Sequence, residues 1–520
     1  MTKALPSSFT IALIVSLGGF VFGFDASVIS GVNSYVSLEF DINEWQLGFL
    51  VGVPTLGAAI ASLVAGTVSD RIGRRKVLLS IAGLYVVSAL LSALASSYWV
   101  LVAARTLGGF AFASLVLAPV YIAEISTASH RGKMISINQF NIVIGISAAY
   151  FANYYLLNLA QQGGEWATAL GITDNVWRWM LGIEVIPAAL FLLLLTRIPE
   201  SPRFLALNNQ KEQARQVLIQ LHGERAMLHE MAEIEEKSHH KKARLLDSFK
   251  ELFSSKMRKV LSIGIIIAVV QQITGVNAIY FYAPTIFEQS GVGTNAAFAQ
   301  AIWVGIINVL FTVVAMLLID KVGRKPLLIV GLTGIFISMS LVSYGFKNAT
   351  YQLTAEQVTQ LPIEASKLDH VVGVNYADDL AFKDAIKESL SPREFKVNEA
   401  KLIQSAINIQ PELVLFGILG FVASFAVSLG PVMWVLLAEI FPNHMRGIAI
   451  AVTGLINSAV SFTVQLMFPW EINYLGTAMT FLLCGIFAVI GLFLVMYLLP
   501  ETKSKSLEQI ELELIPGRVA

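Results

Sequence analysis

The chain has 520 residues, of which 55% are hydrophobic and 14% charged, and its 36 basic and 36 acidic residues leave no net charge. Soluble globular proteins carry about a quarter charged residues, and the polar residues here cluster between long apolar runs, so we expect a membrane protein with the lipid bilayer as a partner. The charge balance gives no basic surface for nucleic acid. The single cysteine excludes a disulfide framework within the chain.

Twelve apolar runs are long enough to cross about 30 Å of hydrocarbon, which takes ~20 helical residues. Lipid offers the backbone no hydrogen-bond partner, so each run is predicted to be a helix of an all-α membrane protein. The first run contains Asp25 and no small-residue cleavage site follows it, so it is interpreted as a span and not as a signal peptide. In chain order the predicted spans are 9–32, 45–68, 77–96, 98–121, 134–157, 178–197, 260–287, 298–319, 326–346, 411–438, 447–469 and 474–499.

Short loops indicate the orientation. The loops at 69–76 and 320–325 are rich in Lys and Arg, whereas 33–44 has three acids and no base. Basic loops stay on the cytoplasmic side, so we expect a multi-pass protein of the plasma membrane (the inner membrane of a bacterium) with both termini in the cytoplasm.

Two charged patterns occur twice. The string Asp-Arg-Ile-Gly-Arg-Arg at 70–75 recurs 250 residues later as Asp-Lys-Val-Gly-Arg-Lys at 320–325, and a Glu-x6-Arg pair also recurs. The pairs are Glu124 with Arg131 and Glu439 with Arg446. This duplication predicts two six-helix halves that move against each other, as in many transporters.

The predicted organisation has four parts. An N-terminal half covers 1–197, a helical cytoplasmic linker covers 198–258, a C-terminal half covers 259–499, and a cytoplasmic tail covers 500–520. Residues 348–410 form an extracellular insertion in the C-terminal half.

The repeated charges are predicted to latch the cytoplasmic face, forming salt bridges in outward-open states and separating in inward-open ones. The set comprises Asp70, Arg71, Arg74, Glu124, Arg131, Glu200, Arg203, Asp320, Arg324, Glu439 and Arg446. In the tenth span, Gly430 and Pro431 form a predicted gate hinge because proline removes a backbone hydrogen bond.

Two charged residues lie inside predicted spans. Asp25 is in the first span, and Arg105 is about 10 Å into the fourth. Burying a lone charge is costly, so such groups are candidates for function. A carboxylate holds a proton weakly beside a guanidinium and more tightly once that group moves away. We interpret the pair as a proton site, with a structural salt bridge as the alternative.

Most other polar groups within the spans are amides, which supply donors and acceptors without charge and suit the hydroxyls of a neutral ligand. Gln271, Gln272 and Asn277 can line one cavity if Gly275 loosens the helix between them. The further candidates are Gln139, Asn308 and Asn457, with Phe24 and Trp434 as aromatic rings that could stack on a sugar. The alternative is that single amides join helices and single aromatics fill the core.

Together these residues resemble the sugar porter family of the major facilitator superfamily. The resemblance rests on Gly66-x3-Asp70-Arg71-x-Gly73-Arg74-Arg75 and on the strings Pro-Glu-Ser-Pro-Arg at 199–203 and Pro-Glu-Thr-Lys at 500–503. It implies that the six named amides contact sugar and that Asp25 and Arg105 couple protons. Facilitative members carry Asn in place of Asp25, so the resemblance favours symport.

The predicted function is therefore proton-coupled import of a neutral monosaccharide by alternating access, by a protein that acts as a monomer. The alternatives are uniport of a sugar or polyol, and a nutrient receptor with little transport. Ser458, Leu429 and Ile146 differ from the residues of sugar-porter relatives, which leaves the sugar open. The sequence has no metal-ligand cluster, nucleophile triad or phosphate loop, so we expect no enzyme activity and no cofactor other than the coupling proton.

Overall fold

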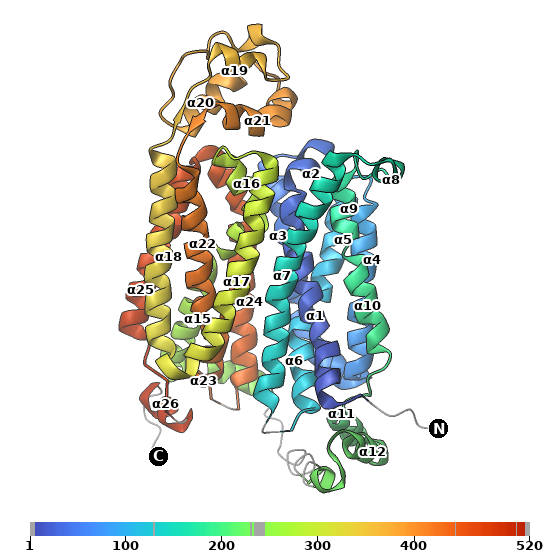
Figure 1. The fold of residues 1–520 in the computed structure, drawn as a ribbon. Helices are drawn as coiled ribbons and strands as arrows, with labels where there is room; N and C mark the ends of the chain where they lie inside the picture. Colours follow the sequence, from blue (N-terminus) through green and yellow to red (C-terminus); the bar gives the residue numbers. More distant parts are fainter. Residues whose placement is uncertain are drawn as a thin grey trace. The chain divides into compact units, whose positions relative to one another are not determined.

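The computed structural model describes residues 6–127, 130–228, 231–232, 245–442, 444–505 and 507–514. Within these ranges, twelve helical segments are long and apolar enough to cross a membrane, which confirms the predicted all-α fold with twelve spans (Figure 1). Eight contain one main helix: α1 (Ser8–Val28, continued by the 3-10 turn η1, Ile29–Gly31), α3 (Glu44–Ile72), α4 (Arg74–Ala93), α7 (Arg131–Gln162), α17 (Thr294–Val322), α18 (Arg324–Lys347), α24 (Arg446–Tyr474) and α25 (Thr477–Leu498). Four contain two helices: α5 (Tyr98–Ala111) with α6 (Ser114–Glu124), α9 (Val176–Gly182) with α10 (Val185–Leu195), α15 (Arg258–Ile273) with α16 (Val276–Gln289), and α22 (Pro411–Val427) with α23 (Leu429–Ile440).

Two of these breaks follow from local chemistry. Gly275 separates α15 from α16 with φ +95°, a left-handed conformation that glycine adopts without strain, as the sequence predicts. The tenth span is interrupted at Ser428, three residues before Pro431. The proline ring clashes with the carbonyl four residues upstream, and that carbonyl belongs to Val427, where α22 ends.

Shorter elements connect the spans. They are α2 (Asn33–Glu39), α8 (Glu165–Ala169), α11 (Pro202–Leu207), α12 (Lys211–His222), α14 (Leu245–Leu252), β1 (Thr350–Tyr351), α19 (Ala355–Thr359), η2 (Ala365–Leu368), α20 (Asp379–Lys387), α21 (Pro392–Ala406), β2 (Ile407–Asn408) and α26 (Leu507–Leu514). Part of the predicted cytoplasmic linker, residues 229–230 and 233–244, lies outside the described residues.

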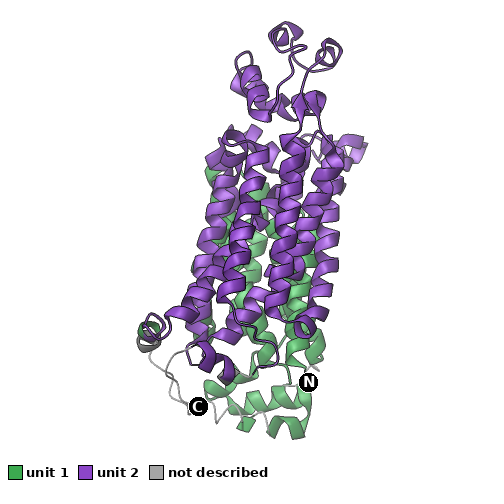
Figure 2. Ribbon diagram, turned by 90° about the vertical axis from the view of Figure 1, so that its left-hand side faces the viewer, with its two compact units in different colours: residues 1–26, 53–149, 181–250 green, residues 27–52, 150–180, 251–520 purple. Residues whose placement is uncertain are grey.

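The chain divides into two compact units that differ from the predicted halves (Figure 2). Unit 1 comprises 1–26, 53–149 and 181–250, and unit 2 comprises 27–52, 150–180 and 251–520. Unit 2 thus combines the C-terminal half with two short stretches of the N-terminal half, 27–52 and 150–180. Both stretches form hydrogen bonds to α16: Asn33 Nδ2 donates to Phe281 O at 2.8 Å, and Tyr150 OH donates to Tyr280 O at 2.6 Å.

Residues 348–410 of unit 2 fold into a small domain with its own core, which we call the cap domain. Strands β1 and β2 pair antiparallel at its base, with Thr350 opposite Asn408, and α19, η2, α20 and α21 follow one another between them (Figure 1). Its core includes Tyr351, Phe382 and Leu402, all 1% exposed. Burial of this apolar area explains why the insertion folds and does not remain a loose loop.

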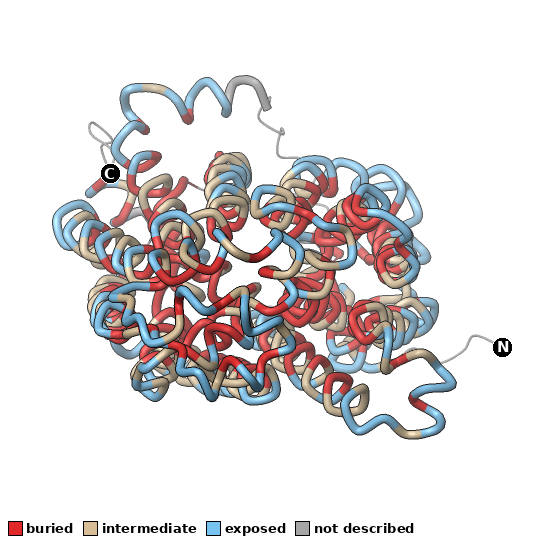
Figure 3. Tube along the Cα trace, turned by 90° about the horizontal axis from the view of Figure 1, so that it is seen from above, coloured by how far each residue is buried: buried red, intermediate tan, exposed pale blue. Residues whose placement is uncertain are grey.

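Most spanning helices have a buried side and an exposed side, visible as alternating colours along the tube in Figure 3. Many exposed side chains on the spans are large and apolar, for example Leu193, Leu317, Val330 and Phe416, each more than half exposed. Such surfaces would be unfavourable in water and suit contact with hydrocarbon.

Candidate functional site

Unit 1 holds a buried ion pair between the first and fourth spans. Arg105 Nη1 donates to Asp25 Oδ1, and Nη2 donates to the backbone oxygen of Asp25 at 3.2 Å. The exposed fractions of the two side chains are 2% and 0%. Asp25 Oδ2 and Arg105 Nε have no hydrogen-bond partner among the described residues. The pair therefore keeps one carboxylate oxygen that can accept a proton.

The sequence analysis missed a third ionisable group beside this pair. Glu184 lies at the break between α9 and α10, is 1% exposed, and interacts electrostatically with Asp25 and Arg105. Its Oε1 has no hydrogen-bond partner among the described residues. Its position within an apolar run was the available signal, since the rule that singles out Asp25 applies equally to Glu184.

Unit 2 brings four of the six predicted amides into one hydrogen-bonded cluster. Gln272 Nε2 donates to Gln271 Oε1 at 3.3 Å and to Asn457 Oδ1 at 3.1 Å. Asn457 Nδ2 donates to Gln271 Oε1 at 2.8 Å and to Ala268 O at 2.9 Å. Asn277 Nδ2 donates to Gln272 Oε1 at 2.9 Å. The turn at Gly275 places Asn277 on the same side as the two glutamines.

A serine and a further glutamine on α24 extend this cluster. Ser461 Oγ accepts from Asn277 Nδ2 at 2.6 Å and from Gln465 Nε2 at 2.8 Å. Ser461 and Gln465 are buried, and the sequence analysis named neither. The four- and eight-residue spacing from Asn457 places all three on one face of α24, which was a usable signal.

The balance of donors and acceptors indicates what this cluster can bind. The side-chain amides of Gln272, Asn277 and Asn457 each donate both of their N–H groups. Gln271 Nε2 donates one N–H to Leu429 O at 3.0 Å. Among the described residues, the Asn277 oxygen has no hydrogen-bond partner. The cluster thus offers mainly acceptors, which suit the hydroxyl hydrogens of a neutral polyhydroxy ligand.

The remaining predicted ligand residues lie outside this cluster. Asn308 is buried on α17, and no hydrogen bond joins it to the four clustered amides in the described structure. Trp434 on α23 is 45% exposed. Gln139 is exposed on α7 in unit 1, and Phe24 is buried there against Phe20, with ring centroids 6.2 Å apart.

The repeated charges form two matching clamps, one in each unit. In unit 1, Arg74 Nη2 lies 2.6 Å from Asp70 Oδ1, and Arg74 binds Glu124 through Nε at 3.1 Å and Nη2 at 3.2 Å. Ser201 Oγ donates to the same glutamate at 2.5 Å. The carboxylate of Glu200 accepts from the backbone N–H of Arg75 at 3.1 Å at the start of α4.

In unit 2, Arg324 Nη2 lies 3.1 Å from Asp320 Oδ1 and 2.8 Å from Glu439 Oε1. Thr502 Oγ1 donates to Glu439 at 2.7 Å, and Glu501 accepts from the backbone N–H of Arg324 at 3.1 Å. Each clamp therefore joins a loop arginine, two acids, a hydroxyl and a capping glutamate. The sequence analysis did not predict the roles of Ser201, Thr502 and Glu501, although the strings that contain them recur after the sixth and twelfth spans.

The other predicted latch residues are placed differently. Arg131 Nε donates to Ala123 O and Arg446 Nε donates to Phe441 O, both at 3.2 Å. Each arginine is the first residue of its helix and bonds to a backbone oxygen in the segment that precedes that helix. Arg71 and Arg203 are exposed.

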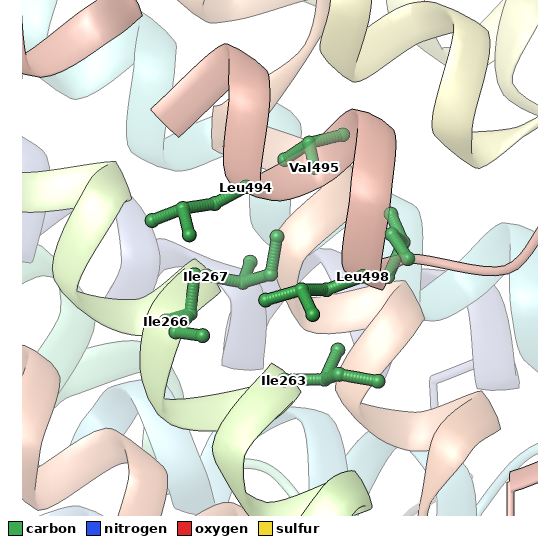
Figure 4. A pocket seen from close by; sticks show the side chains of 7 residues that line it. Ile263, Ile266, Ile267, Leu494, Val495 and Leu498 are labelled. Atoms are coloured by element: carbon green, nitrogen blue, oxygen red, sulfur yellow. The ribbon is translucent and has the colours of Figure 1, made fainter. Parts of the chain in front are cut away.

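A small hollow between α15 and α25 is entirely aliphatic (Figure 4). Its lining residues are Ile263, Ile266, Ile267, Leu494, Val495, Leu498 and Leu499. It offers no polar side chain, so it does not suit a polyhydroxy ligand. Among the described residues, no group of three or more His, Cys, Asp or Glu side chains could hold a metal ion.

Twelve spans, a duplicated clamp and buried polar groups within apolar helices define a multi-pass membrane carrier with an internal repeat. The family model described as "Sugar (and other) transporter" matches residues 11–361 and 399–514. The chain belongs to this sugar transporter family, and it is a transporter and not an enzyme.

Relatives with assigned names cover nearly the whole chain. The arabinose-proton symporter of Bacillus subtilis is 32% identical over 504 residues, which is 96% of this chain and 94% of that protein. The D-xylose-proton symporter of Escherichia coli is 32% identical over 539 residues, which cover 97% of this chain and 95% of that protein. An inward-open structure of the xylose transporter of E. coli is similar with a TM-score of 0.74 at 30% identity, covering 97% of this chain and 99% of that one.

Proposed function

We propose that the protein imports a neutral monosaccharide together with protons by alternating access. The observation that carries the proton coupling is the Asp25–Arg105 pair, which is fully buried and leaves one carboxylate oxygen without a partner. Protonation of Asp25 neutralises one member of the pair and weakens its hold on Arg105, so proton binding changes the balance of forces between the first and fourth spans.

The amide cluster of unit 2 supports a sugar as the cargo. A single neutral hydrogen bond contributes about 0.5–1.5 kcal/mol net, so several of them give an affinity that still allows release. We propose Gln271, Gln272, Asn277 and Asn457 as sugar ligands, with Gln139, Asn308, Trp434 and Phe24 as further candidates. The names of the arabinose-proton and D-xylose-proton symporters support a pentose or related sugar.

We further propose a plasma-membrane location with both termini in the cytoplasm. The Lys- and Arg-rich loops at 69–76 and 320–325 support this orientation, which places the cap domain outside the cell. The exposed apolar side chains of the spans support direct contact with lipid, and a single chain contains both clamps, which is consistent with a monomer.

The test is uptake of radiolabelled sugars into proteoliposomes, with and without an inward proton gradient. The symporter should concentrate its sugar only when the gradient is present. Asp25→Asn should abolish this accumulation and leave exchange of sugar across the membrane, because the amide keeps the shape of the carboxyl and cannot bind a proton.

Each other outcome selects a different function. Equilibration without accumulation by the unaltered protein would establish the uniport alternative. Saturable sugar binding without any flux would favour a nutrient receptor. Loss of both accumulation and exchange in Asp25→Asn would count against a dedicated proton role.

A further inference from the structure

The cap domain carries features that membership of the sugar transporter family does not explain. The family model leaves residues 362–398 unmatched, and these contain α20 and the first half of α21. Three charged side chains in this stretch, Asp379, Lys383 and Lys396, contact the membrane-spanning part of unit 2. We propose that the cap domain is a strap that holds the extracellular side of the carrier closed and must release during each transport cycle.

Two of these side chains attach the strap to the C-terminal half. Asp379 Oδ2 accepts from Thr477 N at 3.1 Å and from Thr477 Oγ1 at 2.8 Å, at the first residue of α25. The neighbouring Gly476 has φ +82° and lies close to this carboxylate, because a Cβ there would lie 3.0 Å from Asp379 Oδ1. This attachment is buried and ties α20 to the twelfth span.

Lys383 provides the second attachment. Its side chain is 2% exposed, and Nζ lies 3.2 Å from Gln289 Oε1 at the end of α16 and 3.1 Å from Glu399 Oε1 on α21. A buried ammonium group is costly unless it is paired, so these contacts define one position of the strap over the seventh span. Ile407 fits against Gly291 just beyond that span, where a Cβ would lie 2.3 Å from Ile407 Cγ2.

The third side chain reaches the N-terminal half. Lys396 Nζ donates to Ile42 O at 2.6 Å and lies 3.6 Å from Asp41 Oδ1, in the turn between α2 and α3. The turn itself is tightly formed, because Asp41 has φ +48° and Ile42 is 2% exposed. One domain therefore contacts the seventh and twelfth spans through α20 and the junction of the first two spans through α21.

The consequence for transport rests on the proposed function. In alternating access the two halves separate on one side of the membrane at a time. The hydrogen bonds of Asn33 and Tyr150 to α16 join stretches of the two predicted halves on this side. Opening it moves Ile42 away from α16, so the bond of Lys396 exists only in the closed state and favours that state.

The first experiment measures opening without transport. In Lys396→Met, hydrogen exchange at residues 33–43 and 281–290 should rise about three- to tenfold, because a charge-assisted bond is lost from the closed state. The matched control is Lys401→Met, an exposed lysine on the same helix that should leave exchange unchanged. Equal exchange in wild type and Lys396→Met would overturn the proposal, whatever sugar the protein carries.

The second experiment locks the strap. In a Cys484→Ala background, the thiols introduced by Asp41→Cys and Lys396→Cys are joined by a short, reducible bifunctional thiol reagent. Uptake should fall at least tenfold after cross-linking and return after reduction. Unchanged uptake by the cross-linked protein would show that the strap moves passively with α2 and would refute the proposal. Absence of uptake both after reduction and in the Cys484→Ala parent would instead count against the proposed function.

Discussion

At the residue scale, Ser461 shows how one hydroxyl can set the chemistry of the amide cluster. The Ser461 oxygen accepts a hydrogen bond from one N–H of Asn277, and the Gln272 side-chain oxygen accepts from the other. The Asn277 oxygen is therefore left for a ligand. Ser461→Ala removes the serine oxygen as an acceptor, so the Asn277 side-chain amide can flip and exchange the positions of its oxygen and nitrogen. We expect sugar affinity to fall about five- to tenfold, the value of roughly one hydrogen bond, in equilibrium binding measurements.

Thr463→Ala is the matched control for this change, because Thr463 is an exposed residue on the same helix whose hydroxyl donates to the backbone oxygen of Ala459. Its affinity should stay within twofold of wild type. A Ser461→Ala protein that also binds sugar normally would show that the Asn277 amide is oriented by Gln272 alone.

Asp25 and Glu184 show where residue-level prediction from sequence succeeds and where it stops. Asp25 is found because Arg105 offers a partner of opposite charge in another span. Glu184 also lies within a predicted span, so the same rule makes it a candidate, but the sequence does not show which charges it faces. The fold shows that it is buried and interacts electrostatically with Asp25 and Arg105.

At the scale of elements, the break at Gly275 gives a direct stability test. Gly275→Ala forces a left-handed conformation that costs alanine about 1–2 kcal/mol, and its Cβ would lie 2.9 Å from Cys484 Sγ. We expect a lower midpoint of thermal unfolding in detergent. Gly83→Ala is the control, because a Cβ at Gly83 on α4 would meet no atom within 4 Å and alanine favours a helix.

The cap domain offers a test of pH dependence. Glu394 at the start of α21 accepts from Lys367 at 2.7 Å and from Ser391, and these bonds lower the pKa of Glu394 to about 2. A lowered pKa stabilises the folded domain above the ordinary carboxyl range, and this contribution is lost as the pH falls from about 4.5 towards 2.

Limited proteolysis within 348–410 can follow this effect. Glu394→Gln should be cut faster than wild type at pH 7. The difference should shrink below about pH 4, because the carboxyl of the opened wild-type chain then takes up a proton while the folded domain still holds Glu394 ionised. A difference of equal size at pH 7 and pH 3 would contradict the assigned ion pair. Because the side chains of Lys367 and Glu394 are 36% and 44% exposed, the effect should be modest and smaller in high salt.

The elements also show which parts of the fold could be predicted. The spans follow from apolar runs, because twenty apolar residues have few alternatives to a membrane helix. The break in the tenth span lies at Ser428 and not at the predicted Gly430 and Pro431, since proline acts on the carbonyl four residues earlier. The cap domain could not be predicted in detail, because its elements are short and its core forms only when residues 349 and 406 come together.

At the scale of the whole molecule, the two clamps show that the repeat seen in the sequence is also a repeat of interactions. They differ in burial. The side chains of Arg74 and Glu124 are 8% and 6% exposed, whereas those of Arg324 and Glu439 are 12% and 20% exposed. Loss of a partner charge costs more where water cannot replace it.

We therefore expect Glu124→Gln to lower the free energy of unfolding by about 2 kcal/mol or more, and Glu439→Gln by about 1 kcal/mol. Thermal unfolding of the two purified variants, compared with Glu165→Gln on α8, would measure both effects. A larger loss of stability in Glu439→Gln than in Glu124→Gln would mean that burial does not determine which clamp contributes more to the free energy of unfolding. Whether these charges also latch the cytoplasmic face during transport stays a prediction.

The hydrogen bonds that join Gln271, Gln272, Asn277 and Asn457 to one another have a consequence for turnover. A symporter that has released its cargo must return without it, and any polar group stripped of partners would make that return slow. Here most of the amide N–H groups bond to one another or to nearby protein oxygens. We expect sugar binding to exchange some of these bonds for others of similar strength, so the loaded and unloaded carriers should face comparable barriers.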